Sequence, residues 1–140
     1  FKVLSYGAVN TEAGVDFNLR LNDIYDGITE LIGKYKPDVI SIEKLFFNTN
    51  NKTAINVAEA RGCTILACVK AGVPVYEYTP LQVKQAIVGY GRAEKRQIQQ
   101  MVKTMLHLED IPRPDDAADA CAIAITHAMS MKLTGIFKIL

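Results

Sequence analysis

Three acidic residues of this chain could act together in chemistry, although they lie far apart in the sequence. Glu43 ends the apolar run 38–43. Asp116 and Asp119 open a predicted helix, and their spacing of three residues places both carboxylates on one helical face. Hard cations such as Mg²⁺ prefer oxygen ligands and leave coordination positions for phosphate oxygens. The three carboxylates therefore predict metal-dependent phosphodiester chemistry.

Each of these acids also has an ordinary structural explanation. A glutamate at a strand end is commonly solvated, and acids in a first helical turn complement the helix dipole, with Asp115 a candidate N-cap. The combination is more specific, because residues 117–124 are mostly small. Small residues let a helix axis lie close to a sheet, and close approach would bring two aspartates within metal reach of a strand-end glutamate.

Basic residues cluster in the middle of the chain. Lys84, Arg92, Lys95 and Arg96 surround the glycine-containing segment 89–91. Glycines let a backbone come close to a phosphate, and the N–H groups at a helix start point toward such an anion. Each cation taken singly is explained by a solvated helix face. Together they favour contact with a nucleic-acid backbone.

Two adjacent aromatic residues, Phe46 and Phe47, follow the candidate glutamate and precede a polar loop. Both could belong to the core, or one could be exposed and stack on an unpaired base. His127 is a third candidate, but it lies eleven residues after Asp116. That separation is about 16 Å along a helix axis. His127 cannot share a metal with Asp116, and we expect a structural or surface role for it.

The composition sets broad limits on the class of protein. The chain of 140 residues is 49% hydrophobic and 22% charged, which is typical of one globular domain. A net charge of +1 does not by itself indicate a nucleic-acid partner. The three cysteines have no metal-ligand spacing, which favours core thiols in a reducing compartment. There is no leader pattern or long apolar run, so we expect a cytoplasmic protein without membrane association.

The pattern of apolar residues predicts an α/β domain with helices on both faces of a sheet. Three strands are few for the number of helices, and the apolar run 39–42 suits a central strand. We therefore expect that one or two strands belonging before Phe1 are missing, with residues 135–140 as a weaker candidate strand. Gly33 and Gly72 are the expected ends of the first two helices. The predicted strands span residues 1–10, 39–43 and 73–78, and the predicted helices span 19–32, 53–71, 80–88, 93–107 and 115–131.

Several segments closely resemble RuvC, a bacterial family of Holliday junction resolvases with a ribonuclease H-like fold. The similar segments are residues 42–48, 59–62, 76–85, 89–95 and 114–120. The resemblance runs in order from about Val3 to Ser130. It implies a domain over residues 1–132, with a central mixed sheet, helices on both faces and the first strands missing. Residues 133–140 are an unassigned tail.

The resemblance implies a homodimer that binds four-way junction DNA in recombination and repair. Such an enzyme nicks two strands symmetrically with Mg²⁺, for which Mn²⁺ can substitute. Two ions per active site are expected, one activating water and the other stabilising the leaving 3′ oxygen. Branch-migration motor proteins are possible partners. The helix from Thr53 to Ala71 is similar to the region that packs subunits together, and Ala54, Ala58 and Gly62 would permit close contact there.

The resemblance also assigns roles to individual residues. Glu43, Asp116 and Asp119 match catalytic metal ligands, and Lys84 and Lys95 match basic residues near the scissile phosphate. Phe46 matches an aromatic residue that contacts bases, and Arg92 joins Lys84 and Lys95 as an expected DNA-binding residue.

One feature of the family has no match in this chain. The family's first acid lies in a first strand similar to Gly-Ile-Asp-Pro-Gly, and no such segment is found here. A second hypothesis is therefore a junction-binding protein that is catalytically incomplete. A third is an α/β domain unrelated to DNA, which predicts no salt-dependent binding to junctions.

Overall fold

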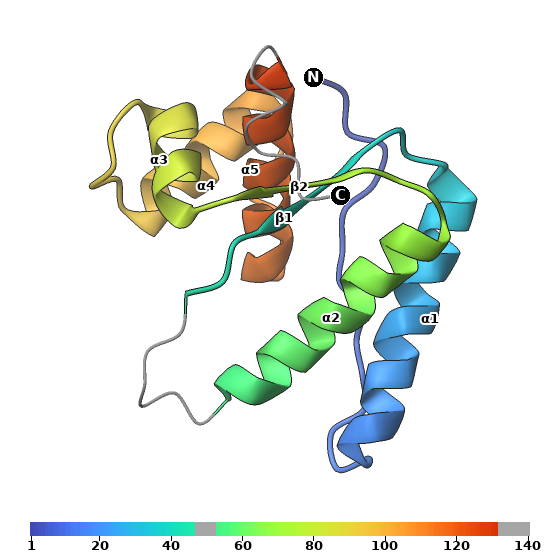
Figure 1. Ribbon diagram of the computed structural model, residues 1–140. Helices are drawn as coiled ribbons and strands as arrows, with labels where there is room; N and C mark the ends of the chain where they lie inside the picture. The colour runs from blue at the N-terminus through green and yellow to red at the C-terminus, as the bar shows by residue number, and fades with distance from the viewer. Residues whose placement is uncertain (47–52, 132–140) are drawn as a thin grey trace. The chain divides into compact units, whose positions relative to one another are not determined.

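Helices and strands alternate up to β2, and three helices then follow in succession, in a computed structural model that describes residues 1–46 and 53–131 (Figure 1). Two compact units are distinguished. Of the described residues, unit 1 contains 1–8, 41–44 and 76–131, and unit 2 contains 9–40, 45–46 and 53–75. The elements are α1 (Phe17–Tyr35), β1 (Ile40–Glu43), α2 (Ala54–Lys70), β2 (Val75–Tyr78), α3 (Pro80–Val88), α4 (Lys95–Met105) and α5 (Asp115–Met129).

The strands β1 and β2 form a two-stranded parallel sheet. The amide of Ile40 donates to the carbonyl of Pro74 at 2.9 Å, and the amide of Lys44 donates to the carbonyl of Tyr78 at 2.8 Å. Both hydrogen bonds join residues with the same separation in sequence, which is the pattern of a parallel pair. Both strands therefore have their carboxyl ends at the same edge of the sheet, where Glu43 closes β1.

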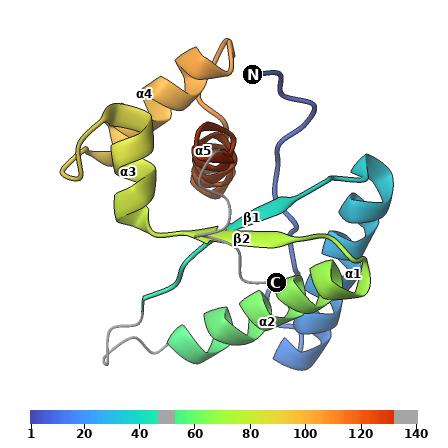
Figure 2. The ribbon, with the colours of Figure 1, turned by 45° about the horizontal axis from the view of Figure 1, so that its top comes forward.

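The core of unit 1 lies where α3, α4 and α5 pack around the end of β2 (Figure 2). Tyr78 and Val102 are almost completely buried within it. The small residues of α5 behave as expected, because Ala117, Ala118 and Ala122 are only 1–2% exposed. With no longer side chain on this face, α5 lies close to the neighbouring elements.

The only two buried polar side chains of the described core, Thr126 and His127, lie on α5. The hydroxyl of Tyr78 is 2.7 Å from Nδ1 of His127, and the ring of Tyr76 packs against the imidazole with centroids 4.5 Å apart. Burial lowers the pKa of His127, so the imidazole is neutral at physiological pH. The structural role expected for this histidine is confirmed.

Helix α3 begins with a capping box. The Thr79 hydroxyl accepts from the amide of Gln82 at 3.1 Å, and the Gln82 side chain accepts from the amide of Thr79 at 2.7 Å. Gly89 ends the helix with a φ of 94°, a conformation that favours glycine. A Cβ atom at Gly91 would meet only the end of the exposed Leu81 side chain, which would have to move. The backbone therefore determines the residue at position 89 more strongly than the one at position 91.

Two expectations about local structure were wrong. Residues 1–10 form no strand, and Leu4 and Tyr6 are 75% and 45% exposed. A β-favouring composition needs a partner strand, and none of the described segments pairs with this one. The helix α1 does not end at Gly33 but continues to Tyr35. It ends where Lys36 adopts a left-handed conformation, because the following Pro37 disfavours the helical one.

The remaining predicted elements are confirmed with shifts of a few residues at their ends. The candidate strand 135–140 lies outside the described residues. A span long and apolar enough to cross a bilayer is not found among the helices of residues 1–46 and 53–131.

We predict that Tyr78→Phe destabilises the fold by about 1–2 kcal/mol, because it removes a hydrogen-bond partner of a buried imidazole. Denaturation by urea measures the change. The matched control is Tyr90→Phe, whose hydroxyl accepts from Gln97 at 2.8 Å on the exposed surface. The control should change stability by less than about 0.5 kcal/mol. Equal losses in both variants would contradict a structural role for the buried pair.

Candidate active site

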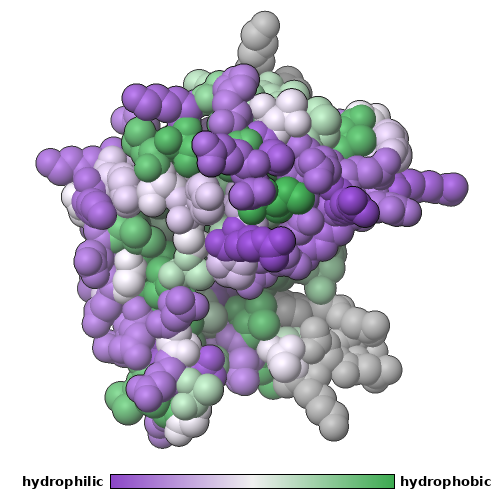
Figure 3. Space-filling model, turned by 180° about the vertical axis from the view of Figure 1, so that it is seen from behind, coloured by the Kyte–Doolittle hydropathy of each residue, from purple (hydrophilic) through white to green (hydrophobic). Residues whose placement is uncertain are grey.

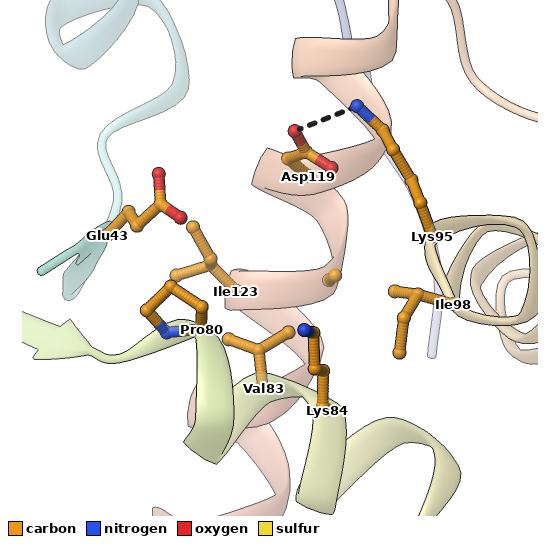
Figure 4. A pocket seen from close by; sticks show the side chains of 9 residues that line it. Glu43, Pro80, Val83, Lys84, Lys95, Ile98, Asp119 and Ile123 are labelled. Carbon is orange, nitrogen blue, oxygen red and sulfur yellow. Dashed lines mark ion pairs between the residues drawn. The ribbon is translucent and has the colours of Figure 1, made fainter. Parts of the chain in front are cut away.

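A cleft of about 230 Å³ in unit 1 gathers four of the charged residues that the sequence singles out (Figure 4). Glu43 reaches it from the end of β1, and Asp119 reaches it from α5. Lys84 comes from α3 and Lys95 is the first residue of α4. The cleft is lined by Glu43, Pro80, Val83, Lys84, Lys95, Ile98, Asp119, Ala122 and Ile123.

The elements place these side chains for reasons that are local. The carboxyl ends of parallel strands are the usual binding edge of an α/β sheet, and Glu43 is the last residue of β1. Asp119 follows the buried pair Ala117 and Ala118, so the packing of these small residues holds its turn of α5 close to the core. Asp116 lies one turn earlier on α5 and is exposed.

The walls between the charged groups are apolar. Val83, Ile98 and Ile123 are buried or nearly so, and Pro80 closes the side next to β2. Figure 4 shows Ile123 and Val83 between the glutamate on one side and the two lysines on the other. Apolar walls displace water and strengthen electrostatic interactions in the cleft.

The carboxylates of the cleft carry negative charge that is incompletely neutralised. Partial burial raises the pKa of Glu43, and the charges of Asp119 and Asp116 raise it further. The pKa of Asp119 is also raised, mainly by burial, although the nearby Lys95 acts in the opposite direction. Each carboxylate is therefore stabilised by a cation that enters the cleft.

The ammonium group of Lys95 lies 3.3 Å from Oδ2 of Asp115 and 3.9 Å from Oδ2 of Asp119. The pKa of this lysine is raised, first by its hydrogen bond to Asp115 and then by the charges of the aspartates. It is protonated at neutral pH. The pairing with Asp115 was not predicted, because it depends on how α4 packs against α5.

The donor set fits a hard divalent cation, because two carboxylates line one cleft and a third adds its charge. Within the described residues, no group of three His, Cys, Asp or Glu side chains is arranged to hold a metal by itself. A cation in this cleft would therefore take further oxygen ligands from water or from a phosphate.

Three predicted site residues do not line the cleft. Asp116 acts on it only through its charge, and Phe46 is 69% exposed in the segment after β1. Arg92 lies in an open groove at the turn between α3 and α4, together with Tyr90 and Arg96. Hydrophilic side chains gather over this turn (Figure 3). Phe47 falls outside the described residues.

The apolar walls of the cleft were not predicted from the sequence. Val83 and Ile123 read as ordinary core positions of two separate helices, and only the packing of α3 against α5 turns them toward a common space.

A comparison with protein families finds a match to the model of crossover junction endodeoxyribonuclease RuvC over residues 1–127. The RuvC protein of Caldanaerobacter subterraneus subsp. tengcongensis is 58% identical over 130 residues, which are 93% of this chain and 79% of that protein. The RuvC protein of Clostridioides difficile is 56% identical over 138 residues, which are 99% of this chain and 82% of that protein.

Solved structures agree with this result. Thermus thermophilus RuvC superposes with a TM-score of 0.88 and 37% identity, covering 99% of this chain and 83% of that one. The same protein in complex with a Holliday junction substrate superposes with a TM-score of 0.91 and 37% identity, covering 99% of this chain and 84% of that one. The ribonuclease H-like fold expected from the resemblance is confirmed.

We predict that Glu43→Gln slightly stabilises the fold when no divalent cation is present. The raised pKa means that the folded state binds more protons than the unfolded state. Ionisation of Glu43 therefore opposes folding as the pH rises above about 4.3. Because the side chain is largely exposed, the gain at pH 7 is at most a few tenths of a kcal/mol.

Urea denaturation at pH 7 in the presence of a chelator measures this gain. The matched control is Glu30→Gln on the exposed surface of α1, for which no gain is expected. A clear loss of stability in Glu43→Gln would mean that this side chain supports the fold instead of serving a charged site.

Proposed function

This chain belongs to the RuvC family of crossover junction endodeoxyribonucleases, and we propose that its cleft hydrolyses phosphodiester bonds of four-way junction DNA with the help of divalent cations. The observation that carries the proposal is the meeting of Glu43 and Asp119 in one cleft with two lysines. A cytoplasmic location suits a DNA substrate and stays a prediction. So does any association with branch-migration motor proteins.

Glu43 and Asp119 are proposed to hold the cation, with Asp116 as a further ligand or as a source of negative charge. Mg²⁺ is the proposed ion, with Mn²⁺ as a substitute and two ions in each site. Such ions supply a nucleophile from water at neutral pH and stabilise the charge on a leaving oxygen. The raised pKa values of both cleft carboxylates support this assignment, because like charges are brought together without a full set of partners.

Lys84 and Lys95 are proposed to act on the scissile phosphate. Negative charge accumulates on the phosphoryl oxygens during an in-line displacement, and a fixed ammonium group stabilises that charge. The apolar walls formed by Val83, Ile98 and Ile123 reduce the amount of water beside the phosphate, although the Lys95 side chain itself remains 57% exposed. Position and charge are the contribution of these two lysines.

Phe46 and Arg92 are proposed to bind the DNA outside the cleft. Phe46 exposes a large apolar ring three residues after the cleft glutamate, which suits stacking on an unpaired base at a junction. Arg92 lies in the open groove at the turn from α3 to α4, where it suits contact with a phosphate of a DNA arm.

We also propose that the chain forms a homodimer through α2. Apolar and small residues recur at helical spacing along its exposed face, which is how a helix that packs against another helix is built. Adding a Cβ atom to Gly62 would meet no atom of the same chain within 4 Å. The stripe consists of Ile55, Ala58, Gly62, Leu66 and Val69.

A dimer would present two copies of the cleft related by a two-fold axis. A four-way junction has similar symmetry, so paired sites explain paired nicks. The dimer is therefore part of the proposed function and not an independent property of the fold.

Incubation of a four-way junction with the wild-type chain and Mg²⁺, followed by a denaturing gel, tests the proposed activity. We expect paired nicks from the wild type. Glu43→Gln should reduce cleavage at least about a hundredfold, because a ligand of the cation loses its charge. A mobility-shift assay should find junction binding by this variant largely unchanged.

The control for this experiment is Glu30→Gln, which should cut like the wild type. A junction that is shifted but not cut by the wild type would support the second hypothesis, a binding protein without catalysis. Absence of a salt-dependent shift would contradict both hypotheses, since phosphate contacts weaken steeply as salt rises.

We predict that Gly62→Leu prevents dimer formation without weakening the helix, because leucine is the better helix former and its side chain would occupy the proposed contact. Light scattering should give a dimer for the wild type and a monomer for this variant, with dissociation at least about tenfold more favourable. Gly33→Leu is the matched control, since Gly33 is also an exposed helical glycine with open space around it. A dimer in all three proteins would exclude this face.

A further inference from the structure

The lysine at the mouth of the cleft is shared between two acids of α5, and only one of them faces the cleft. The ammonium group of Lys95 is 3.3 Å from Asp115 and 3.9 Å from Asp119. Asp119 lines the cleft, whereas Asp115 does not. The closer partner of Lys95 therefore lies outside the proposed metal site.

Asp115 is itself held by a second side chain of α4. The amide of Gln99 donates to its Oδ1 at 3.4 Å, while its Oδ2 faces Lys95. Lys95 and Gln99 are four residues apart on α4, and Asp115 and Asp119 are four residues apart on α5. Each pair therefore lies on one face of its helix. Two side chains of α4 thus contact the Asp115 carboxylate, one at each oxygen.

This arrangement bears on which acid the lysine neutralises. A lysine paired only with Asp119 would satisfy that carboxylate and compete with a cation for it. Asp115 offers Lys95 a nearer partner whose charge is not needed in the cleft. We propose that Asp115 is a positioning residue, which holds Lys95 beside the cleft and thereby keeps Asp119 available to a divalent cation. The inference rests on the proposed function, because only a site that binds a cation needs a free Asp119.

A simpler explanation exists for an aspartate at this position. Asp115 is in the first turn of α5, where any acid complements the helix dipole. That explanation predicts that removal of the Asp115 charge changes metal binding equally whether Lys95 is present or absent. The positioning role predicts an effect that passes through Lys95. The two are separated by a double-mutant cycle.

The experiment measures Mn²⁺ binding to the full chain without DNA, by calorimetry or by the paramagnetic resonance of free Mn²⁺. The proteins are the wild type, Asp115→Asn, Lys95→Met and the double variant. We expect Asp115→Asn to weaken Mn²⁺ binding at least about threefold and Lys95→Met to strengthen it. In the Lys95→Met background, Asp115→Asn should change the affinity by much less than threefold. Asp110→Asn, an exposed acid in the loop before α5, should leave Mn²⁺ binding unchanged.

Three results would overturn the inference. The first is an equal weakening by Asp115→Asn in both backgrounds, which would mean that Asp115 acts only through its own charge. The second is an unchanged Mn²⁺ affinity in Asp115→Asn. The third is the absence of Mn²⁺ binding by the wild type.

These outcomes are distinguishable from failure of the proposed function. Paired nicks in a junction together with equal weakening in both backgrounds would remove the positioning role and leave the nuclease intact. If the junction is not nicked but the effect of Asp115→Asn on Mn²⁺ binding depends on Lys95, the proposed nuclease activity is contradicted. The positioning of Lys95 by Asp115 would still stand.

Discussion

The close packing of α5 is the constraint on which the cleft depends. An aspartate side chain is short, so Asp119 reaches the same space as a strand-end glutamate only where the helix axis lies near the core. Ala117, Ala118 and Ala122 allow this approach because their side chains are small and are only 1–2% exposed. Larger residues at these positions would move α5 away and take Asp119 out of the cleft.

The other end of α5 is fixed in a different way. His127 is held in the core by the hydroxyl of Tyr78, at 2.7 Å, and by the ring of Tyr76. Both tyrosines belong to β2, whose neighbour β1 carries Glu43 at its end. The helix that supplies one acid is therefore attached to the sheet that supplies the other. A buried hydrogen bond between residues that do not line the cleft contributes in this way to the geometry of the acids.

Charge placement in the cleft is unfavourable to the fold and useful to the proposed chemistry. Partial burial and like charges raise the pKa of Glu43 and of Asp119. A sequence selected for stability alone would replace one acid with a neutral residue. Active sites commonly keep such unfavourable groups because a bound cation or substrate stabilises them.

The sequence predicted those features that are determined by neighbours along the chain. The predicted helix 80–88 starts where expected, because Thr79 supplies a local cap and proline is favoured at the first helical position. The strand predicted over residues 1–10 was wrong, because a strand forms only with a partner strand, which local composition does not reveal. The pairing of Lys95 with Asp115 and the apolar walls depend on helix packing, so no local pattern indicates them. The roles proposed for Lys84, Lys95, Phe46 and the acids came from family resemblance, which carries information that spacing does not.

The free-energy cost of Gly62 in the middle of α2 also supports the proposal that this helix packs against a partner helix. Glycine inside a helix costs about 1 kcal/mol relative to alanine. Among the described residues, a methyl group at Gly62 would meet no atom within 4 Å, so packing between these residues does not require the glycine. Gly33 has similar open space, but it lies in the last turn of α1, where the ends of helices fray and the cost is smaller. The cost at Gly62 is therefore best offset by a contact outside the chain, and the exposed apolar residues Ile55 and Leu66 on the same face are what such a contact would bury.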